Sequence, residues 1–320
     1  MSMLINITNA IGTVLIDLFW YNQLELLQDR VTAMPKASQT PIAVILMMGK
    51  KVRIKDEQIK LIVSDMDGCL LDGNGELPSR FAEALHLMNE RRVIFAAASG
   101  RAVGGMKRPF GDYSDHISFI SDNGARIFLN GKCIHHRILP YEKYLPVIKE
   151  MREHKGLLPV ACGVNGAWVE HMDDITPEME QELSRYYLTW KECSFDHIPD
   201  EIIKFALLYF DDIEKNIYPY FSRFDDKDIC VQVTAFIWID IFEKGVSKGE
   251  GIRCLQKKLG ISPEETIVFG DYLNDLPMAD HAGRSFAPIN AHHMVKERFT
   301  DIIDSNTNGS VTEKIIELLR

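Results

Sequence analysis

Residues 61–68 read Leu61-Ile62-Val63-Ser64-Asp65-Met66-Asp67-Gly68, an apolar run that passes directly into two aspartates one residue apart. A short apolar run bounded by turn residues predicts a buried strand. Residues two apart on a strand point the same way, so Asp65 and Asp67 would share one small volume before Gly68 lets the chain turn. Carboxylates this close raise one pKa or require a cation. The stretch predicts a chemically active strand end, and the alternative is a solvated turn rich in Asp and Gly.

Strands and helices alternate after this first strand. Further strands are predicted over residues 93–98 and 117–121, and polar residues follow each of them. The segment 78–92 has the apolar spacing of an amphipathic helix, with Pro78 near its start. Such alternation predicts a parallel sheet with right-handed crossovers and a ligand site at the carboxyl ends of the strands.

The middle of the chain has a different pattern. Residues 127–136, with Asn130-Gly131 in the centre, predict a β-hairpin. Helices are then predicted over 141–155, 177–188 and 213–224, and strands over 166–170, 202–210 and 229–233. These elements suffice for an independent α+β domain of about 100 residues. The first pattern is expected to resume at Phe236, with a helix over 248–259 and a strand over 266–269.

The chain is thus predicted to be an α/β protein with a doubly wound, Rossmann-like parallel-sheet core and an inserted α+β domain. The expected parts are an N-terminal extension over residues 1–58, a core made of residues 59–136 and 237–320, and an insertion over residues 137–236.

The composition limits the classes of partner. Of 320 residues, 46% are hydrophobic, and the formal net charge is −10. A negative chain without a block of Lys and Arg argues against nucleic acid and membranes as partners, whereas a small phosphorylated ligand is compatible because a metal can supply positive charge. The six cysteines include no Cys-x-x-Cys pair, which favours a reducing cytoplasm over a disulfide framework.

Polar motifs stand in chain order at predicted strand ends and at one helix start. They are Asp65-Met66-Asp67-Gly68, Ala98-Ser99-Gly100-Arg101, Val246-Ser247-Lys248-Gly249 and Gly270-Asp271-Tyr272-Leu273-Asn274-Asp275-Leu276-Pro277-Met278. Together they resemble the motifs of the haloacid dehalogenase (HAD) superfamily of phosphatases. The long insertion after the second motif is similar to the C2 cap of the Cof-type members, subfamily IIB. The resemblance covers about residues 58–320 and implies a HAD core with a C2-type cap domain.

The resemblance implies a role for each motif residue. Asp65 would attack phosphorus and form an aspartyl phosphate, while Asp67 would protonate the leaving oxygen and later activate water. Ser99 and Lys248 would bind the phosphoryl oxygens. Substrate-binding positions are expected at Gly100, Arg101, Asn123, Gly124 and Asn274. The alternatives are a helix cap for Ser99 and a solvated side chain for Lys248.

A Mg²⁺ cofactor is implied as well, since this ion prefers octahedral oxygen coordination. The expected ligands are the carboxylates of Asp65 and Asp271 and the backbone carbonyl of Asp67, with Asp275 as a further or outer ligand. The alternative for Asp271 and Asp275 is a capped helix start, where the helix dipole favours carboxylates. Cys69 stands where the family usually has threonine, and this thiol predicts an activity sensitive to oxidation.

The expected protein is a cytoplasmic, Mg²⁺-dependent phosphomonoesterase acting on a small phosphorylated metabolite, either a sugar phosphate or a phosphorylated cofactor. Its specificity is expected to come from side chains of residues 137–236. One alternative is a hexose phosphomutase, which would return the phosphoryl group to its substrate. The other is a non-catalytic regulatory protein on a HAD scaffold, against which the costly pair Asp65 and Asp67 argues.

Overall fold

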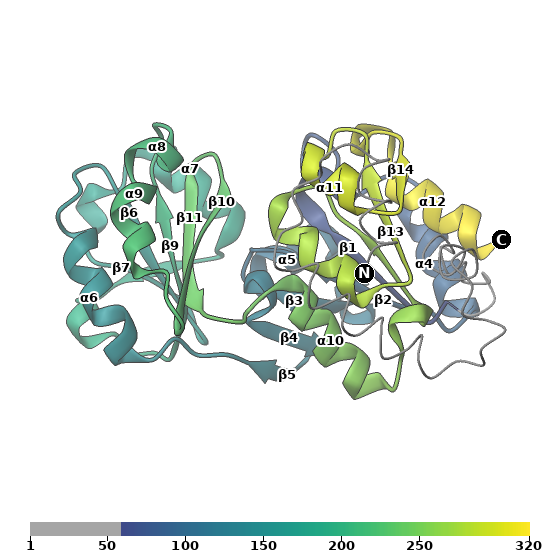
Figure 1. The fold of residues 1–320 in the computed structure, drawn as a ribbon, viewed down its shortest axis with the longest axis horizontal. Coiled ribbons are helices and arrows are strands. Elements are labelled where there is room, and N and C mark those ends of the chain that lie inside the picture. Colours follow the sequence, from purple (N-terminus) through teal and green to yellow (C-terminus); the bar gives the residue numbers. More distant parts are fainter. Residues whose placement is uncertain (1–58) are drawn as a thin grey trace, which may run out of the picture. The chain divides into compact units, whose positions relative to one another are not determined.

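The computed structural model describes residues 59–320, so the expected N-terminal extension over residues 1–58 lies outside the described residues. The described chain forms two β-sheets, whose main strands are labelled in Figure 1. The larger has the strand order β14-β13-β12-β1-β2-β3-β4-β5, and the smaller has the order β10-β11-β9-β6-β7-β8. Within residues 59–320, no helix is both long enough and apolar enough to cross a membrane.

The larger sheet is parallel from β14 to β3 and ends in an antiparallel hairpin. Its strands are β1 (Leu61–Asp65), β2 (Ile94–Ala98), β3 (Ser118–Ser121), β4 (Arg126–Leu129), β5 (Lys132–His136), β12 (Thr266–Phe269), β13 (Arg284–Pro288) and β14 (Asp301–Ile303). Val63 of β1 lies between Ala96 of β2 and Val268 of β12. Strand β1 is therefore central, and the predicted parallel sheet and hairpin are confirmed.

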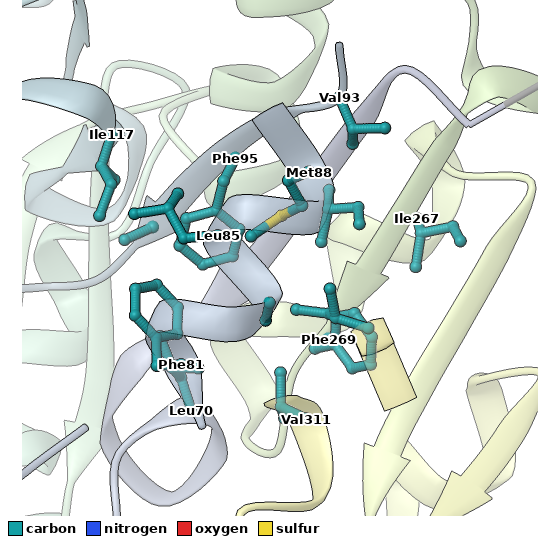
Figure 2. Packing of buried hydrophobic residues seen from close by; sticks show 14 of the residues in the cluster. Leu70, Phe81, Leu85, Met88, Val93, Phe95, Ile117, Ile267, Phe269 and Val311 are labelled. Carbon is teal, nitrogen blue, oxygen red and sulfur yellow. The ribbon is translucent and has the colours of Figure 1, made fainter. Parts of the chain in front are cut away.

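Helices cover both faces of this sheet because its buried strands are apolar on both sides. Ile62 packs in one cluster with α4 (Phe81–Glu90), α5 (Val103–Phe110) and α12 (Ser310–Leu319). Figure 2 shows this cluster, in which Phe269 of β12 lies near Val311 of α12. Leu61 and Val63 point to the other face and pack with α10 (Lys248–Leu259) and α11 (His293–Arg298). This arrangement confirms the doubly wound core.

The smaller sheet is antiparallel except for the pair β7 and β8. Its strands are β6 (Leu158–Gly163), β7 (Ala167–Val169), β8 (Trp190–Glu192), β9 (Ile202–Leu208), β10 (Ile229–Ala235) and β11 (Trp238–Glu243). The accompanying helices are α6 (Tyr141–Met151), α7 (Pro177–Tyr186), α8 (Ile213–Asn216) and α9 (Tyr218–Phe221). The single helix predicted over 213–224 is broken after α8, where Pro219 cannot continue the hydrogen-bond ladder of a preceding turn.

Strand β11 corrects one prediction. The core pattern was expected to resume at Phe236, but Trp238–Glu243 pairs with β9 and β10 in the smaller sheet. A continuous apolar run predicts a buried strand, but its sequence does not indicate to which of two sheets the strand belongs. The chain returns to the larger sheet only through α10, so the expected core segment 237–320 begins with a strand that belongs to the other sheet.

Candidate active site

The first motif turns sharply after β1. The N–H of Leu71 donates to the carbonyl of Met66 at 2.8 Å and closes the turn. Gly68 within it has φ +77°, and a Cβ at this position would lie 2.5 Å from Oδ2 of Asp271. Both the backbone conformation and the approach of Asp271 therefore require glycine. The turn leaves Asp65 only 6% exposed and brings it beside the end of β12.

Lys248 lies between two carboxylates at the start of α10. Its Nζ donates to Oδ1 of Asp65 and, at 2.7 Å, to Oδ1 of Asp275. Burial works to lower the pKa of Lys248, but the charges of Asp275 and Asp65 outweigh it and raise the pKa above its ordinary value. The side chain is 1% exposed, so the alternative of a solvated lysine is wrong.

Three carboxylates gather at this point. Asp65, Asp271 and Asp275 each offer an oxygen, and these atoms lie within 4.8 Å of one another. Burial raises the pKa of Asp65 to about 7 against the opposing charge of Lys248. Burial, with the charges of Asp65 and Asp275, raises the pKa of Asp271 to about 9. Like charges buried this close favour protonation unless a cation shares the site.

The polar atoms around the cluster fit a hard divalent cation. Oδ1 of Asp271 is buried and has no hydrogen-bond partner within residues 59–320. Asp275 uses its Oδ2 to accept the backbone N–H groups of Asp271 at 2.9 Å and Tyr272 at 3.1 Å. Asp275 thus caps the turn, as the alternative of a capped helix start expected, while its Oδ1 accepts from Lys248. An orphaned carboxylate oxygen beside two others is the donor set that Mg²⁺ prefers.

The side chain of Asp67 is not part of this cluster. It is 48% exposed and accepts from Nε of Arg101 at 2.9 Å and from the Nη2 group of the same arginine. The Arg101 guanidinium in turn lies 5.7 Å from the ring centroid of Tyr186 in α7. Arg101, expected to bind substrate, is therefore occupied by Asp67 in this structure.

The remaining predicted residues follow β2, β3 and β12. Ser99 is 3% exposed, and its Oγ accepts the N–H of Arg101 at 3.1 Å. Asn123 has φ +56° in a turn of left-handed residues, and its Oδ1 accepts from Nδ2 of Asn274 at 3.0 Å. Gly124, with φ +100°, would bring a Cβ within 2.1 Å of the carbonyl oxygen of Ser247. This turn thus rests against the start of α10.

A cavity of about 370 Å³ opens over these groups. The predicted residues that line it are Asp65, Asp67, Ser99, Gly100, Asn123, Lys248, Asp271 and Asn274, whereas Arg101, Gly124 and Asp275 do not line it. The smaller sheet, the turn between β10 and β11, and α7 add further lining residues, among them Tyr186, Lys204, Phe236, Trp238 and Asp240.

Sequence reasoning missed Lys204 and Asp240. Lys204 is the only charge in the apolar strand Ile202–Leu208, and Asp240 is the charge in the interior of Trp238–Glu243, which ends in Glu243. A charge in a buried strand must find a partner, and this was the available signal.

Cys69 is fully buried beside Ser64, with Sγ 3.8 Å from Oγ. Burial, together with the charges of Asp271 and Asp65, raises the pKa of Cys69 well above its ordinary value. Oxidation requires an accessible thiolate. The structure therefore does not support the expected sensitivity to oxidation.

Comparison with known proteins agrees with this geometry. The family model described as haloacid dehalogenase-like hydrolase matches residues 62–315. The 5-amino-6-(5-phospho-D-ribitylamino)uracil phosphatase YbjI of Escherichia coli (strain K12) is 30% identical over 264 residues, which cover 82% of this chain and 97% of the relative. The phosphatase YcsE of Bacillus subtilis (strain 168), with the same named substrate, is 24% identical over 264 residues, or 82% of this chain and 97% of its own.

A solved structure supports the same assignment. The haloacid dehalogenase-like hydrolase from Bacteroides thetaiotaomicron aligns with a TM-score of 0.71 and 26% identity, covering 81% of this chain and 99% of that one. The chain therefore belongs to the haloacid dehalogenase-like hydrolases and is a Cof-type phosphatase of that family.

Proposed function

We propose that this phosphatase is Mg²⁺-dependent and hydrolyses a small phosphorylated metabolite through an aspartyl phosphate on Asp65. One observation carries the proposal: Asp65 lines the cavity and is held by Lys248 within a cluster of carboxylates. A buried carboxylate with a raised pKa is costly to the fold, and such groups concentrate at catalytic sites.

The carboxylates of Asp65 and Asp271 and the backbone carbonyl of Asp67 would hold the ion, with Asp275 as a further or outer ligand. Bound Mg²⁺ offsets negative charge on the transferring phosphoryl group and on the nucleophilic carboxylate. Lys248 carries a fixed positive charge to the same place, and it would bind a phosphoryl oxygen together with the hydroxyl of Ser99. The proposed site thus combines a nucleophile with groups that compensate the charge of its substrate.

The proposed reaction has two steps. In the first, a carboxylate oxygen of Asp65 forms a bond to phosphorus while the bond to the leaving oxygen breaks, and Asp67 donates a proton to that oxygen. In the second, Asp67 removes a proton from water, which attacks phosphorus and releases phosphate from Asp65. The exposure of Asp67 supports this role, because a half-exposed carboxylate exchanges protons readily. Asp67 must leave Arg101 to take up its proton.

The walls of the cavity support a substrate with both polar and planar parts. Its volume of about 370 Å³ suits a small ligand. The cavity is lined by the aromatic residues Tyr186, Phe236 and Trp238 and by the charged pair Lys204 and Asp240. Two relatives are named for a phosphorylated ribityl chain attached to a uracil ring. We place the substrate in this chemical class, a phosphorylated sugar or a phosphorylated cofactor precursor.

The division into core and cap and the location in the cell belong to the same proposal. The smaller sheet would be the cap, reaching from Arg137 to Glu243, and the larger sheet the core. All six cysteines are free, which supports a location in the reducing cytoplasm.

The test is phosphate release from a panel of sugar phosphates, nucleotides and phosphorylated cofactor precursors, with Mg²⁺ and with a chelator. Asp65→Asn should lose at least about 1,000-fold in kcat, because the nucleophile is gone. Asp115→Asn, which changes an aspartate whose side chain is 83% exposed, is the matched control and should keep wild-type rates. Turnover in the chelator, or by Asp65→Asn, would contradict the mechanism.

A further inference from the structure

Lys204 and Asp240 are two charged residues of the smaller sheet that none of the motifs includes. They lie on neighbouring strands, where Asp240 of β11 is opposite Ala206 and Lys204 of β9 is opposite Phe242. Alternate residues of a strand share a face, so both side chains project from the same face of the sheet. Each is 3% exposed, and both line the cavity over Asp65.

These two residues link the smaller sheet to the loops of the larger one. Nζ of Lys204 donates to Oδ2 of Asp240 at 2.7 Å and to the carbonyl oxygen of Gly100 at 2.9 Å. The same Oδ2 accepts from Nδ2 of Asn123 at 2.8 Å. Asn123 continues the chain of bonds to Asn274. The network therefore reaches Gly100, which follows Ser99 in the chain, and Asn274, which precedes Asp275.

A buried ion pair of this kind is a poor way to stabilise a fold. Removing two charges from water costs about as much as their attraction returns, and apolar residues would pack the same space at least as well. The pair can instead fix the positions of its neighbours. The carbonyl of Gly100 accepts from the Lys204 ammonium and the amide of Asn123 donates to the Asp240 carboxylate, and such charge-assisted hydrogen bonds are strong and directional.

A second cap pair provides the contrast. Lys143 and Asp228 form an ion pair at 2.5 Å whose side chains are 38% and 33% exposed. Among the described residues it makes no hydrogen bond to the larger sheet. Contact with the phosphate-binding loops thus distinguishes Lys204 and Asp240 from the pair Lys143 and Asp228.

We propose that Lys204 and Asp240 are positioning residues that hold the Ser99–Arg101 loop and the Asn123 turn in their phosphate-binding geometry when the cap is in contact with the core. The inference rests on the proposed function, because it takes the Ser99–Arg101 loop and the Asn123 turn to be phosphate-binding groups that the cap holds in place. The pair acts through Gly100 and Asn123 and not on the reacting atoms. A displacement of about 1 Å in such loops lowers a rate by about 100-fold.

The experiment compares Lys204→Met, Asp240→Asn and the double variant with the wild type. Lys143→Met is the matched control, because it makes the same substitution in a cap ion pair that does not contact the core. Three quantities are measured: amide hydrogen exchange in peptides spanning 99–101 and 122–124, the Kd of inorganic phosphate with Mg²⁺, and kcat/KM on the best substrate of the panel.

We expect Lys204→Met to speed exchange in both peptides and to weaken phosphate binding, each by about 10-fold, and to lower kcat/KM by about 10- to 100-fold. Lys143→Met should match the wild type in all three. The double variant removes both charges of the pair, so neither is left buried without a partner. If a single variant does not fold, the double variant is used to test the positioning role.

A double variant with a lower Tm but wild-type exchange and wild-type phosphate affinity would overturn the inference, because the pair would then be structural only. Failure of the proposed function is recognised separately. In that case the wild type itself hydrolyses no phosphomonoester, whereas exchange at 99–101 and 122–124 still tests whether the pair holds the loops.

Discussion

Asp65 and Asp67 are one residue apart, yet they occupy opposite environments. Asp65 is buried against Lys248, and Asp67 is half exposed and paired with Arg101. A carboxylate held in place by a fixed charge suits a nucleophile, and one in contact with solvent suits proton transfer. The division of roles proposed for the two aspartates thus follows from burial, which the turn at Gly68 imposes.

Burial of Asp65 makes the stability of the metal-free protein depend on pH. Its pKa is about 7 in the folded protein against an ordinary value of 3.8. Its contribution to the free energy of unfolding is therefore complete below about pH 4 and is lost as the pH rises through about 7. Asp65→Asn is neutral throughout, so its Tm relative to wild type should rise by about 2–6 °C between pH 5 and pH 8.

Scanning calorimetry in a chelator measures this difference. Asp115→Asn should track the wild type at both pH values, since Asp115 is exposed. A Tm of Asp65→Asn that falls relative to wild type between pH 5 and pH 8 would show that the ion pair with Lys248 outweighs the cost of burial.

Cys69 should be among the least reactive thiols of the folded chain. It is fully buried with a raised pKa, whereas Cys133 is exposed. With iodoacetamide at pH 8, we expect Cys133 to be modified at least about 100-fold faster than Cys69, because only an accessible thiolate reacts. Mass spectrometry of timed samples gives both rates, and activity should survive peroxide. Rapid modification of Cys69 in the native state would restore the expectation drawn from the sequence.

At the scale of elements, helix α10 and the turn of residues 122–124 determine where Lys248 lies. Ser247 caps the helix by accepting the N–H of Glu250 at 3.1 Å, which fixes Lys248 as its first residue. Gly124 lets the turn approach the carbonyl of Ser247 without a Cβ in between. The position of the lysine thus depends on close contact between two loops far apart in sequence.

Gly124→Ala should therefore damage activity as well as stability. Its Cβ would lie 2.1 Å from the carbonyl oxygen of Ser247 and must displace the start of α10. We expect a loss of about 1–3 kcal/mol in the free energy of unfolding and a fall in kcat of more than about 10-fold. Denaturant unfolding and steady-state kinetics measure the two effects.

Gly131→Ala is the matched control for backbone strain. Gly131 has φ +73°, but a Cβ there would meet nothing within 4 Å. It should lose stability through strain alone and keep the wild-type kcat. Equal kcat values for the two variants would mean that the contact with Ser247 does not position Lys248.

At the scale of the whole molecule, Mg²⁺ should stabilise the folded protein. A ligand at about 100 times its Kd adds about 2.7 kcal/mol, which corresponds to a rise in Tm of about 5 °C for a chain of this size. The rise should be larger at pH 9 than at pH 6, because the pKa of Asp65 is about 7 and that of Asp271 is about 9, and protons compete with the ion below these values.

Thermal unfolding with MgCl₂, against NaCl of equal ionic strength, measures this effect. Asp271→Asn removes one carboxylate of the cluster and should abolish most of the rise. A rise that persists in Asp271→Asn, or that NaCl reproduces, would place the stabilising ion elsewhere.

The sequence by itself determined the fold class and the order of the motifs. An apolar strand followed by Asp65 and Asp67, and further strands ending at Ser99 and Asp271, are local patterns that periodicity and turn chemistry specify. Parallel strands bring their carboxyl ends to one edge, so the meeting of these residues followed from the fold class. Lys248 was also named, because Val246-Ser247-Lys248-Gly249 at a predicted helix start resembles a motif of the HAD superfamily.

Only the tertiary structure decided which distant residues complete the site. The sheet to which Trp238–Glu243 belongs, the binding of Asp67 by Arg101 and the link from Lys204 and Asp240 to Gly100 all depend on contacts between segments far apart in the chain. Burial has the same origin, and it sets the pKa of Asp65 and protects Cys69. Such contacts come from packing of whole elements, which local propensity and spacing do not encode.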